Sequence, residues 1–390
     1  MNSLIQKCKY YNNHQTACSL MINDLVPAVV YPFKDDDIWA KYDWGFLMDK
    51  ENSLYKYFQD NLLNRFPEIR GTFFIPLSSY KYILESTGYK IFRIDFNEDF
   101  VGFLNRISSN FDFAFHGTRH GKCINPQNFE LRNNWKQEFE YLTLQDIEKL
   151  QEEINSFESK SGFNFTGGKY PGYKKNEYSE EILEKLGFKW WASSCYMLNR
   201  KTSTNKHGYF GNERKILDLP TNLSGNIFNN NLVSLSNSVK FRKLIKKTLR
   251  YKQKINPNNY ILYLYENQLP ITIQEHFQNQ RTDGKRQTPN IFDDISSLDK
   301  IYSILRGSDI WYINCSELSH YLESYDNTEV IINKNQFEIK YKGNWDKMFL
   351  SFASNHREIK NLESGNIEHG VYKNTKWIFN DLKEGKYQLI

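Results

Sequence analysis

The chain alternates between two kinds of hydrophobic pattern. Residues 17–22, 71–75 and 111–115 are short apolar runs, as is typical of strands that are buried on both faces. Residues 53–66 and 143–157 instead place their apolar side chains at helical spacing, which predicts helices with one face in the core. Strands that alternate with helices in this way indicate a parallel α/β sheet or barrel.

The same alternation continues to about residue 313. Gly187 follows a short helical pattern at 179–186 and is placed to end that helix. The 89–95 segment is either another strand or an excursion from the sheet. Further elements of this part are a helix at 295–305 and strands at 188–192, 216–219, 269–276 and 309–313.

After about Asp326 the pattern changes. Short apolar segments are divided by Asn, Gly and Lys turns, with no helical stretch between them. This pattern predicts an all-β region of about 65 residues, near the lower end of domain size. We therefore expect two domains, an α/β domain at 1–325 and a small β-sandwich-like module at 326–390.

Composition narrows the class of protein. The 390 residues carry 51 basic and 46 acidic side chains, so the net charge of +5 does not by itself predict a nucleic-acid partner. The five cysteines are scattered without a CxxC pair, which is typical of free thiols in a reducing compartment. The first residues lack the apolar segment of a secretion signal, and no run of about 18 apolar residues could span a membrane. The expectation is a soluble cytoplasmic protein.

The most informative chemical feature is a pair of histidines, His116 and His120, directly after the strand at 111–115. Gly117 and Gly121 break this strand into a turn or a first helical turn. Imidazoles spaced i, i+4 on such a turn can bind one ion. The alternative interpretation is two surface histidines near a loop.

Two more candidate residues follow other predicted strands. Asp24 ends the strand at 17–22, and His276 ends the strand at 269–276. Because the carboxyl ends of parallel strands meet at one rim of a barrel, we expect Asp24 to join the histidine pair in a site for Zn²⁺ or a similar divalent ion. The structural alternatives are a helix cap for Asp24 and a hydrogen-bonded core histidine for His276.

These residues and their neighbours resemble motifs of the polysaccharide deacetylase (NodB-homology) family of carbohydrate esterases. The resemblance implies a distorted (β/α)7 barrel that removes acyl groups from amino sugars. It also implies Asp24, His116 and His120 as metal ligands and His276 as the acid that protonates the departing amine. The likeness runs in chain order over roughly residues 15 to 320, through the segments 20–24, 71–74, 116–120, 168–173 and 271–276.

The resemblance also suggests where a substrate would bind. Tyr170, Pro171 and Tyr173 lie in the segment that resembles the motif walling the family's groove. A backbone N–H near Tyr173 would help to hold the oxyanion. Trp39 and Trp44 either stack on a sugar face or belong to the local core.

Two departures from the family pattern concern the general base. Asn23 stands where the family has the aspartate that serves as base, and Lys169 stands where it has the arginine paired with that aspartate. Because both halves of one ion pair have changed, we interpret this region as a rebuilt base site. The candidates for the missing carboxylate are Asp36 with its neighbours Asp35 and Asp37 and, more weakly, Glu275.

The acidic run at 35–37 leaves alternatives open. A second alignment places Asp36 and Asp37 on the first family motif and takes residues 29–33 as the first strand. Pro32 inside a central strand argues against this alignment. A solvated acidic loop is the plain interpretation of the same residues.

A basic stretch at 240–254 contains eight Lys or Arg residues and no acidic residue. An ordinary barrel helix with a basic outer side is the plain interpretation. The sharper one is a surface for peripheral contact with an anionic membrane or a lipid-linked substrate.

Together these patterns predict a metal-dependent amide hydrolase that acts on an N-acylated sugar of a surface-polysaccharide or glycan precursor. A catalytically degenerate glycan-binding protein on the same barrel is the alternative, motivated by Asn23 and Lys169. A barrel glycosidase with paired carboxylates is disfavoured because the candidate site is centred on histidines. Zn²⁺ is the expected metal, and neither a nucleic-acid partner nor a transmembrane segment is expected.

Overall fold

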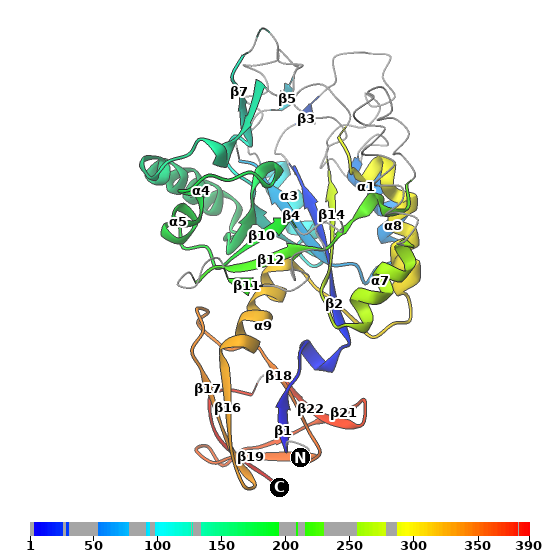
Figure 1. Cartoon of the computed structure of the whole chain (residues 1–390), viewed down its shortest axis with the longest axis vertical. Helices are drawn as coiled ribbons and strands as arrows, with labels where there is room; N and C mark the ends of the chain where they lie inside the picture. The colour runs from blue at the N-terminus through cyan, green and yellow to red at the C-terminus, as the bar shows by residue number, and fades with distance from the viewer. Residues whose placement is uncertain are drawn as a thin grey trace.

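The structure is a computed structural model of the whole chain (Figure 1). It describes residues 4–25, 29–30, 54–77, 91–93, 98–125, 127, 134–194, 208–209, 215–229, 256–277, 287–380 and 382–390. Asp36, Trp39, Trp44 and the basic stretch at 240–254 lie outside these residues, as do Asp35 and Asp37. None of the helices in the described part is long and apolar enough to cross a membrane.

A ten-stranded, largely parallel sheet forms the centre of the molecule. Its strands follow the order β11-β12-β10-β9-β6-β4-β2-β14-β13, with β15 beside β2, and only the β11–β12 pair is antiparallel. The strands predicted for the α/β part are all confirmed. β9, β11 and β13 were not predicted. The strands of the sheet are β2 Thr16–Asn23, β4 Gly71–Ile75, β6 Phe111–Phe115, β9 Gly167–Lys169, β10 Trp190–Ser194, β11 Gly208–Tyr209, β12 Leu217–Thr221, β13 Leu223–Ser224, β14 Ile271–His276 and β15 Ile310–Tyr312.

The two ends of this sheet come from one segment of chain. Near one end, β12 pairs with β10 and is followed only by β11, and at the other end β13 pairs with β14. Only Asn222 separates β12 from β13 in the chain. The Asn222 backbone N–H donates to Thr272 Oγ1 (2.9 Å), and its side-chain amide donates to the Pro270 carbonyl (2.7 Å). The sheet therefore curls until its two ends share a single stretch of backbone.

Helices cover the outer face of the sheet, as Figure 1 shows for α4 and α5 on one side and α1, α7 and α8 on the other. The predicted helices at 53–66, 143–157, 179–186 and 295–305 are confirmed, whereas α3, α7 and α9 were not predicted. Thr143 and Asp146 form a capping box, and Gly187 adopts φ = 79° after α5. The bounds are α1 Leu54–Phe58 with a π-helical extension Gln59–Leu63, α3 Glu98–Ile107, α4 Ile147–Ser161, α5 Ser179–Lys185, α7 Pro257–Glu266, α8 Ile291–Leu305 and α9 Cys315–Asn327.

Alternate side chains of β2 enter two different hydrophobic clusters. Leu20 and Ile22 pack with the outer helices, whereas Ala17 and Met21 face the inner side of the curled sheet. The inner cluster continues through α9 into the C-terminal strands, where it includes Phe337. The base of the curled sheet is therefore filled by side chains rather than open.

The C-terminal part consists of strands without a helix among its described residues after Asn327. Five strands form one sheet, β16-β17-β23-β19-β20, and three form a second sheet with β1 in the order β1-β18-β22-β21. The division at 325/326 and the sandwich-like module stay predictions. The bounds are β1 Ile5–Lys7, β16 Thr328–Asn333, β17 Gln336–Tyr341, β18 Ser351–Ser354, β19 Glu358–Asn361, β20 Ile367–His369, β21 Val371–Lys373, β22 Lys376–Asn380 and β23 Gly385–Leu389.

Two short ribbons lie apart from the large sheets. β3 (Val29–Val30) pairs only with β5 (Ile91–Arg93) in an antiparallel ribbon, so the 89–95 segment is the predicted excursion. The second alignment, with 29–33 as the first strand of the main sheet, is therefore wrong, because β2 occupies that position. The other ribbon pairs β7 (Gly121–Cys123) with β8 (Trp135–Gln137).

A buried carboxyl group on β6 gives a first prediction. Asp112 Oδ2 accepts a hydrogen bond from the Ser316 N–H at the start of α9 (3.1 Å), while Oδ1 is buried without a hydrogen-bond partner. Burial raises the pKa of Asp112 to about 6. Because the folded state holds this proton more tightly than the unfolded chain, the stability that it contributes is complete below about pH 4 and is lost as the pH rises through 6.

Replacing Asp112 with asparagine should therefore remove this pH dependence. Relative to the wild type, the free energy of unfolding of Asp112→Asn should rise between pH 4 and 7 by at most roughly 3 kcal/mol, at about 1.4 kcal/mol per pKa unit. Urea unfolding of both proteins at pH 4.5 and 7.5 measures the difference. Parallel changes in the two proteins would contradict the expected protonation of Asp112.

Candidate metal centre

Asp24 lies directly after β2, at the carboxyl end of the parallel sheet. Its backbone N–H donates to the Phe74 carbonyl (3.0 Å), and its φ of 67° turns the chain out of the strand. Aspartate tolerates this left-handed conformation better than most residues. The side chain is 3% exposed, so its carboxylate is held within the end of the sheet.

His116 and His120 approach Asp24 from the end of β6. His116 follows the strand directly, and a bend rather than a helical turn brings His120 back, with φ of 82° at Gly117 and 60° at His120. The predicted turn is confirmed, but the alternative of a first helical turn is wrong. Glycine at 117 removes most of the steric cost of the positive φ, so the sharp bend sets the separation of the two imidazoles.

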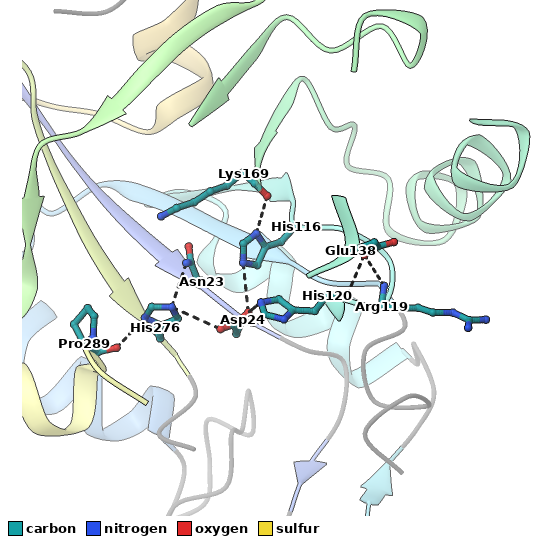
Figure 2. A network of polar contacts seen from close by, with 9 residues as sticks. All are labelled: Asn23, Asp24, His116, Arg119, His120, Glu138, Lys169, His276 and Pro289. Carbon is teal, nitrogen blue, oxygen red and sulfur yellow. Dashed lines mark hydrogen bonds and ion pairs between the residues drawn. The ribbon is translucent and has the colours of Figure 1, made fainter. Parts of the chain in front are cut away.

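The three side chains converge on one point (Figure 2). Asp24 Oδ1 lies 3.5 Å from His116 Nε2 and 3.3 Å from His120 Nε2. One ligand atom from each residue falls within 4.8 Å of the others. A carboxylate and two imidazoles at this spacing form a donor set that suits Zn²⁺ and related divalent ions.

The protonation of His116 also fits a metal ligand. Its Nδ1 lies 2.8 Å from the Lys169 carbonyl, which can only accept, so Nδ1 carries the proton and donates it. The Nε2 lone pair then faces Asp24, buried and without a hydrogen-bond partner. Burial lowers the pKa of His116 to about 3, so the ring is neutral near pH 7. A divalent ion would satisfy this orphaned nitrogen.

The charge of Asp24 completes the donor set. Burial alone would raise the pKa of this carboxyl, but the three nearby imidazoles and the Lys169 ammonium hold its pKa below the ordinary value. Asp24 is thus available as an anionic ligand. The residues present therefore fit a divalent ion, and the choice of Zn²⁺ stays a prediction.

His276, at the end of β14, stands beside this cluster. Its Nδ1 donates to the Pro289 carbonyl (2.8 Å), which leaves the lone pair on Nε2. Asn23 Nδ2 donates to that nitrogen (3.3 Å), and Asp24 Oδ2 lies 4.0 Å from it. Burial lowers the pKa of His276 to about 4. His276 therefore presents a neutral ring with a proton acceptor facing Asp24.

Lys169 and Asn23, the two departures from the family pattern, meet at the same site (Figure 2). Lys169 is fully buried, and its Nζ lies over the rings of Phe74 (5.1 Å) and Tyr173 (4.9 Å) without a hydrogen-bond partner. Burial lowers the pKa of Lys169 to about 7. Asn23 Oδ1 is also buried and unpartnered. Both groups retain capacity for a further polar partner.

The segment after β9 bends in a 3-10 turn at Pro171–Tyr173, with Gly172 and Tyr173 at positive φ. The Tyr173 hydroxyl lies 2.7 Å from Gln274 Oε1 and 3.0 Å from Thr221 Oγ1, so its ring is fixed beside Lys169. Tyr170 is buried against Phe139 (5.0 Å between ring centroids). Substrate contacts of Tyr170, Pro171 and Tyr173 stay predictions.

Glu275 does not belong to this cluster. Strand alternation places it on the face of β14 opposite to His276, where a Cβ on Gly225 would lie 1.5 Å from its Oε1. Burial, followed by the charge of Asp294, raises the pKa of Glu275 well above its ordinary value. The weaker candidate for the missing base is therefore wrong. Asp36 stays a candidate whose position lies outside the described residues.

Sequence reasoning missed Glu138, a buried residue in the 3-10 turn Glu138–Glu140. Its carboxylate contacts the loop that carries His120 (Figure 2). No spacing rule points to it, because its partners near the site are mainly backbone N–H groups.

Comparison with known proteins finds distant structural likenesses. No family model and no curated protein matches the chain. The solved structures that it resembles include polysaccharide deacetylases. The search thus returns the family whose motifs the sequence resembles. A protein assigned as a polysaccharide deacetylase from Mycobacterium smegmatis aligns over 83% of this chain and 96% of its own, with 12% identity and a TM-score of 0.41.

Two further solved structures that the chain resembles are described differently. An allantoinase aligns over 80% of this chain and 92% of its own, with 13% identity and a TM-score of 0.41. A mutant CE4 family pseudoenzyme with restored enzymatic activity aligns over 78% and 67%, with 10% identity and a TM-score of 0.35. These likenesses are distant, and the proposals below rest on the side chains of this chain.

Proposed function

We propose that this protein is a metal-dependent amide hydrolase that removes the acyl group from an N-acylated sugar of a surface-polysaccharide or glycan precursor. The single observation that carries the proposal is the convergence of Asp24, His116 and His120, with the neutral ring of His276 at their side. When bound, a divalent ion supplies Lewis-acid polarisation of the amide carbonyl and of a water molecule. Zn²⁺ is the ion that we propose.

His276 is placed to move the proton of the reaction. With its Nδ1–H held by the Pro289 carbonyl, its Nε2 lone pair can accept a proton from the attacking water once the Asn23 amide, which donates to it, gives way. The same nitrogen can then return that proton to the departing amine. Asn23 cannot accept a proton in this pH range, but its amide donates to Nε2 and orients the ring. We therefore assign both the base and the acid role to His276, with Asp36 as the competing candidate for the base.

The loop at 170–173 would form one wall of the substrate groove. Tyr173 is held rigidly by Gln274 and Thr221. Because the N–H groups of Tyr173 and Lys174 donate to the Tyr170 and Pro171 carbonyls, the backbone N–H proposed to stabilise the oxyanion would be that of Gly172. We propose Trp39 and Trp44 as further sugar contacts and the 240–254 stretch as a peripheral contact with an anionic membrane or a lipid-linked substrate. A cytoplasmic location accompanies this proposal.

The architecture that we propose around the site is a distorted (β/α)7 barrel at 1–325 with a small β module at 326–390. Support for the barrel comes from β12 and β13, which are consecutive in the chain. In the sheet order β13 is the last strand at one end, and β12 is followed only by β11 at the other. Closure through this segment would place Asp24, His116 and His276 around one rim.

A second candidate function is a catalytically degenerate, glycan-binding protein on the same fold. It is favoured by Asn23 at the position where the family has its base and by the unpartnered Nζ of Lys169. In the described part of the chain, Asp24 is the carboxylate that lies within 4.0 Å of His116, His120 and His276. This candidate predicts metal binding without hydrolysis.

The purified protein can decide between the two candidates. Metal content is measured by inductively coupled plasma mass spectrometry, and acetate release is measured over a panel of N-acetylated amino sugars and their nucleotide-linked forms. Hydrolysis that stops after chelation and returns with added Zn²⁺ supports the hydrolase. Stoichiometric metal without acetate release supports the degenerate protein, and a protein that binds no divalent ion rules out both.

Substituting Asn23 with aspartate is a second discriminating measurement. The substitution would add a carboxylate at hydrogen-bond distance from His276 Nε2 and so supply an additional base. General bases contribute about 10²- to 10⁴-fold. We expect kcat to rise by about tenfold if His276 already serves as the base, and to rise from zero in a degenerate site. Asn23→Ala is the control, and the prediction fails if Asn23→Asp lowers kcat as much as alanine does.

A further inference from the structure

We infer that Glu138 is a positioning residue that holds His120 in place for metal binding. This inference rests on the proposed metal centre and extends it to a segment that contributes no ligand. The residue lies in the turn Glu138–Glu140, which follows the β7–β8 ribbon. Its side chain is 2% exposed.

The Glu138 carboxylate accepts hydrogen bonds from the segment that carries His120. Oε1 accepts from the Thr118 hydroxyl (2.6 Å), and Oε2 accepts from the backbone N–H groups of Arg119 (2.9 Å) and His120 (3.0 Å). All three donors belong to the loop between the two histidine ligands. A carboxylate can accept at both oxygens, whereas a glutamine side chain would turn N–H donors toward one set of partners.

The loop between His116 and His120 bends sharply. Gly117 and His120 both have positive φ, a conformation that is unfavourable for a non-glycine residue such as His120. The Glu138 carboxylate satisfies two N–H groups that this bend leaves without a partner in secondary structure. A Cβ on Gly117 would lie 2.3 Å from Glu138 Oε2. The glycine at 117 thus makes room for the carboxylate as well as for the bend.

Glu138 is also bonded directly to the backbone of His120. Glu138 contacts this residue twice, since its carboxylate accepts from the His120 N–H and its own N–H donates to the His120 carbonyl (3.1 Å). His116 needs no such brace, because β6 and the Lys169 carbonyl already fix it. The His120 side chain is 21% exposed and follows a bend. Its ring position therefore depends on Glu138.

The turn that carries Glu138 is itself held in place by its neighbours. The Phe139 ring packs against Tyr170 and Trp191, with centroid distances of 5.0 and 5.8 Å. The Phe139 carbonyl accepts from the Ser179 hydroxyl (3.3 Å). A Cβ on Gly117 would also lie 3.3 Å from Pro171 Cγ. The turn thus contacts both the histidine loop, through Glu138, and Tyr170 of the 170–173 loop, through Phe139.

The test compares Glu138→Gln with Glu140→Gln, a matched control in the same turn. The Glu140 carboxylate is exposed and accepts from the Gln137 N–H (2.8 Å), away from the metal ligands. Each metal-free protein is titrated with Co²⁺, whose visible absorption reports ligand geometry, and with Zn²⁺ in competition with a chelator. We expect Glu138→Gln to lower the affinity for both ions by about 10- to 100-fold and to change the Co²⁺ spectrum. Glu140→Gln should match the wild type.

Thr118→Val keeps the inference testable if Glu138→Gln does not fold. It removes one of the three hydrogen bonds and leaves both backbone bonds, so the loss of affinity should be smaller than for Glu138→Gln. A lowered Tm of the metal-free protein with unchanged Kd and an unchanged Co²⁺ spectrum would overturn the positioning role. A wild type that binds neither ion would instead remove the proposed function on which this inference depends.

Discussion

Replacing His116 with alanine should remove metal binding while leaving a folded protein. His116 Nε2 is a buried donor atom without a hydrogen-bond partner and faces the Asp24 carboxylate at 3.5 Å. Without it, only Asp24 and His120 remain of the donor set. Residues that merely support a ligand alter affinity by about 10- to 100-fold, so we expect the loss of a ligand to exceed about 100-fold.

The measurement is the Zn²⁺ Kd by chelator competition, together with metal content after dialysis. His369→Ala is the matched control, since His369 lies on β20, is exposed, and pairs with Glu358 (3.2 Å). Circular dichroism of the metal-free proteins separates loss of metal from loss of fold. If His116→Ala retains one equivalent of Zn²⁺ at wild-type affinity, the assignment of the metal centre is wrong, and the proposed chemistry fails with it.

The strands could be predicted because their apolar runs are buried on both faces. All eight residues of β2 are buried, so the sequence there is almost continuously apolar. Helix α9 was missed, although Asn314 caps it and Leu318, Tyr321 and Leu322 give it an apolar stripe. Its N-terminus packs on Thr72 and Asp112 of the sheet. These contacts join residues that are far apart in the sequence, so they add no local pattern to the cap and the stripe.

The candidate site was predictable to the extent that the sheet is parallel. Asp24, His116 and His276 each follow a strand, and parallel pairing of β14, β2, β4 and β6 brings those strand ends to one edge. What could not be predicted depends on backbone atoms. The carbonyls of Lys169 and Pro289 fix which nitrogen of His116 and His276 carries the proton, and a carbonyl has no signature in sequence.

The same carbonyls lead to the second large effect, on His276. We expect His276→Ala to lower kcat by about 10²- to 10⁴-fold, the usual contribution of general acid–base catalysis, with little change in the Kd for Zn²⁺. The reason is that His276 Nε2 lies beside the metal ligands, 4.0 Å from Asp24 Oδ2, and is held by Asn23 rather than by the donor set. Steady-state kinetics and a Zn²⁺ titration of the same sample measure both quantities.

Substrates with different leaving groups can separate the two roles of His276. An aryl acetate releases a phenolate that needs no proton, whereas an amide releases an amine that does. If His276 acts only as the acid, the loss of kcat in His276→Ala should be large for the amide and nearly absent for the ester. If it also takes the proton of the attacking water, the loss should persist for both. The orientation imposed by Pro289 places a lone pair on Nε2 before any substrate binds, so we expect the loss to persist. An ester rate equal to that of the wild type would assign the base to another group, such as Asp36.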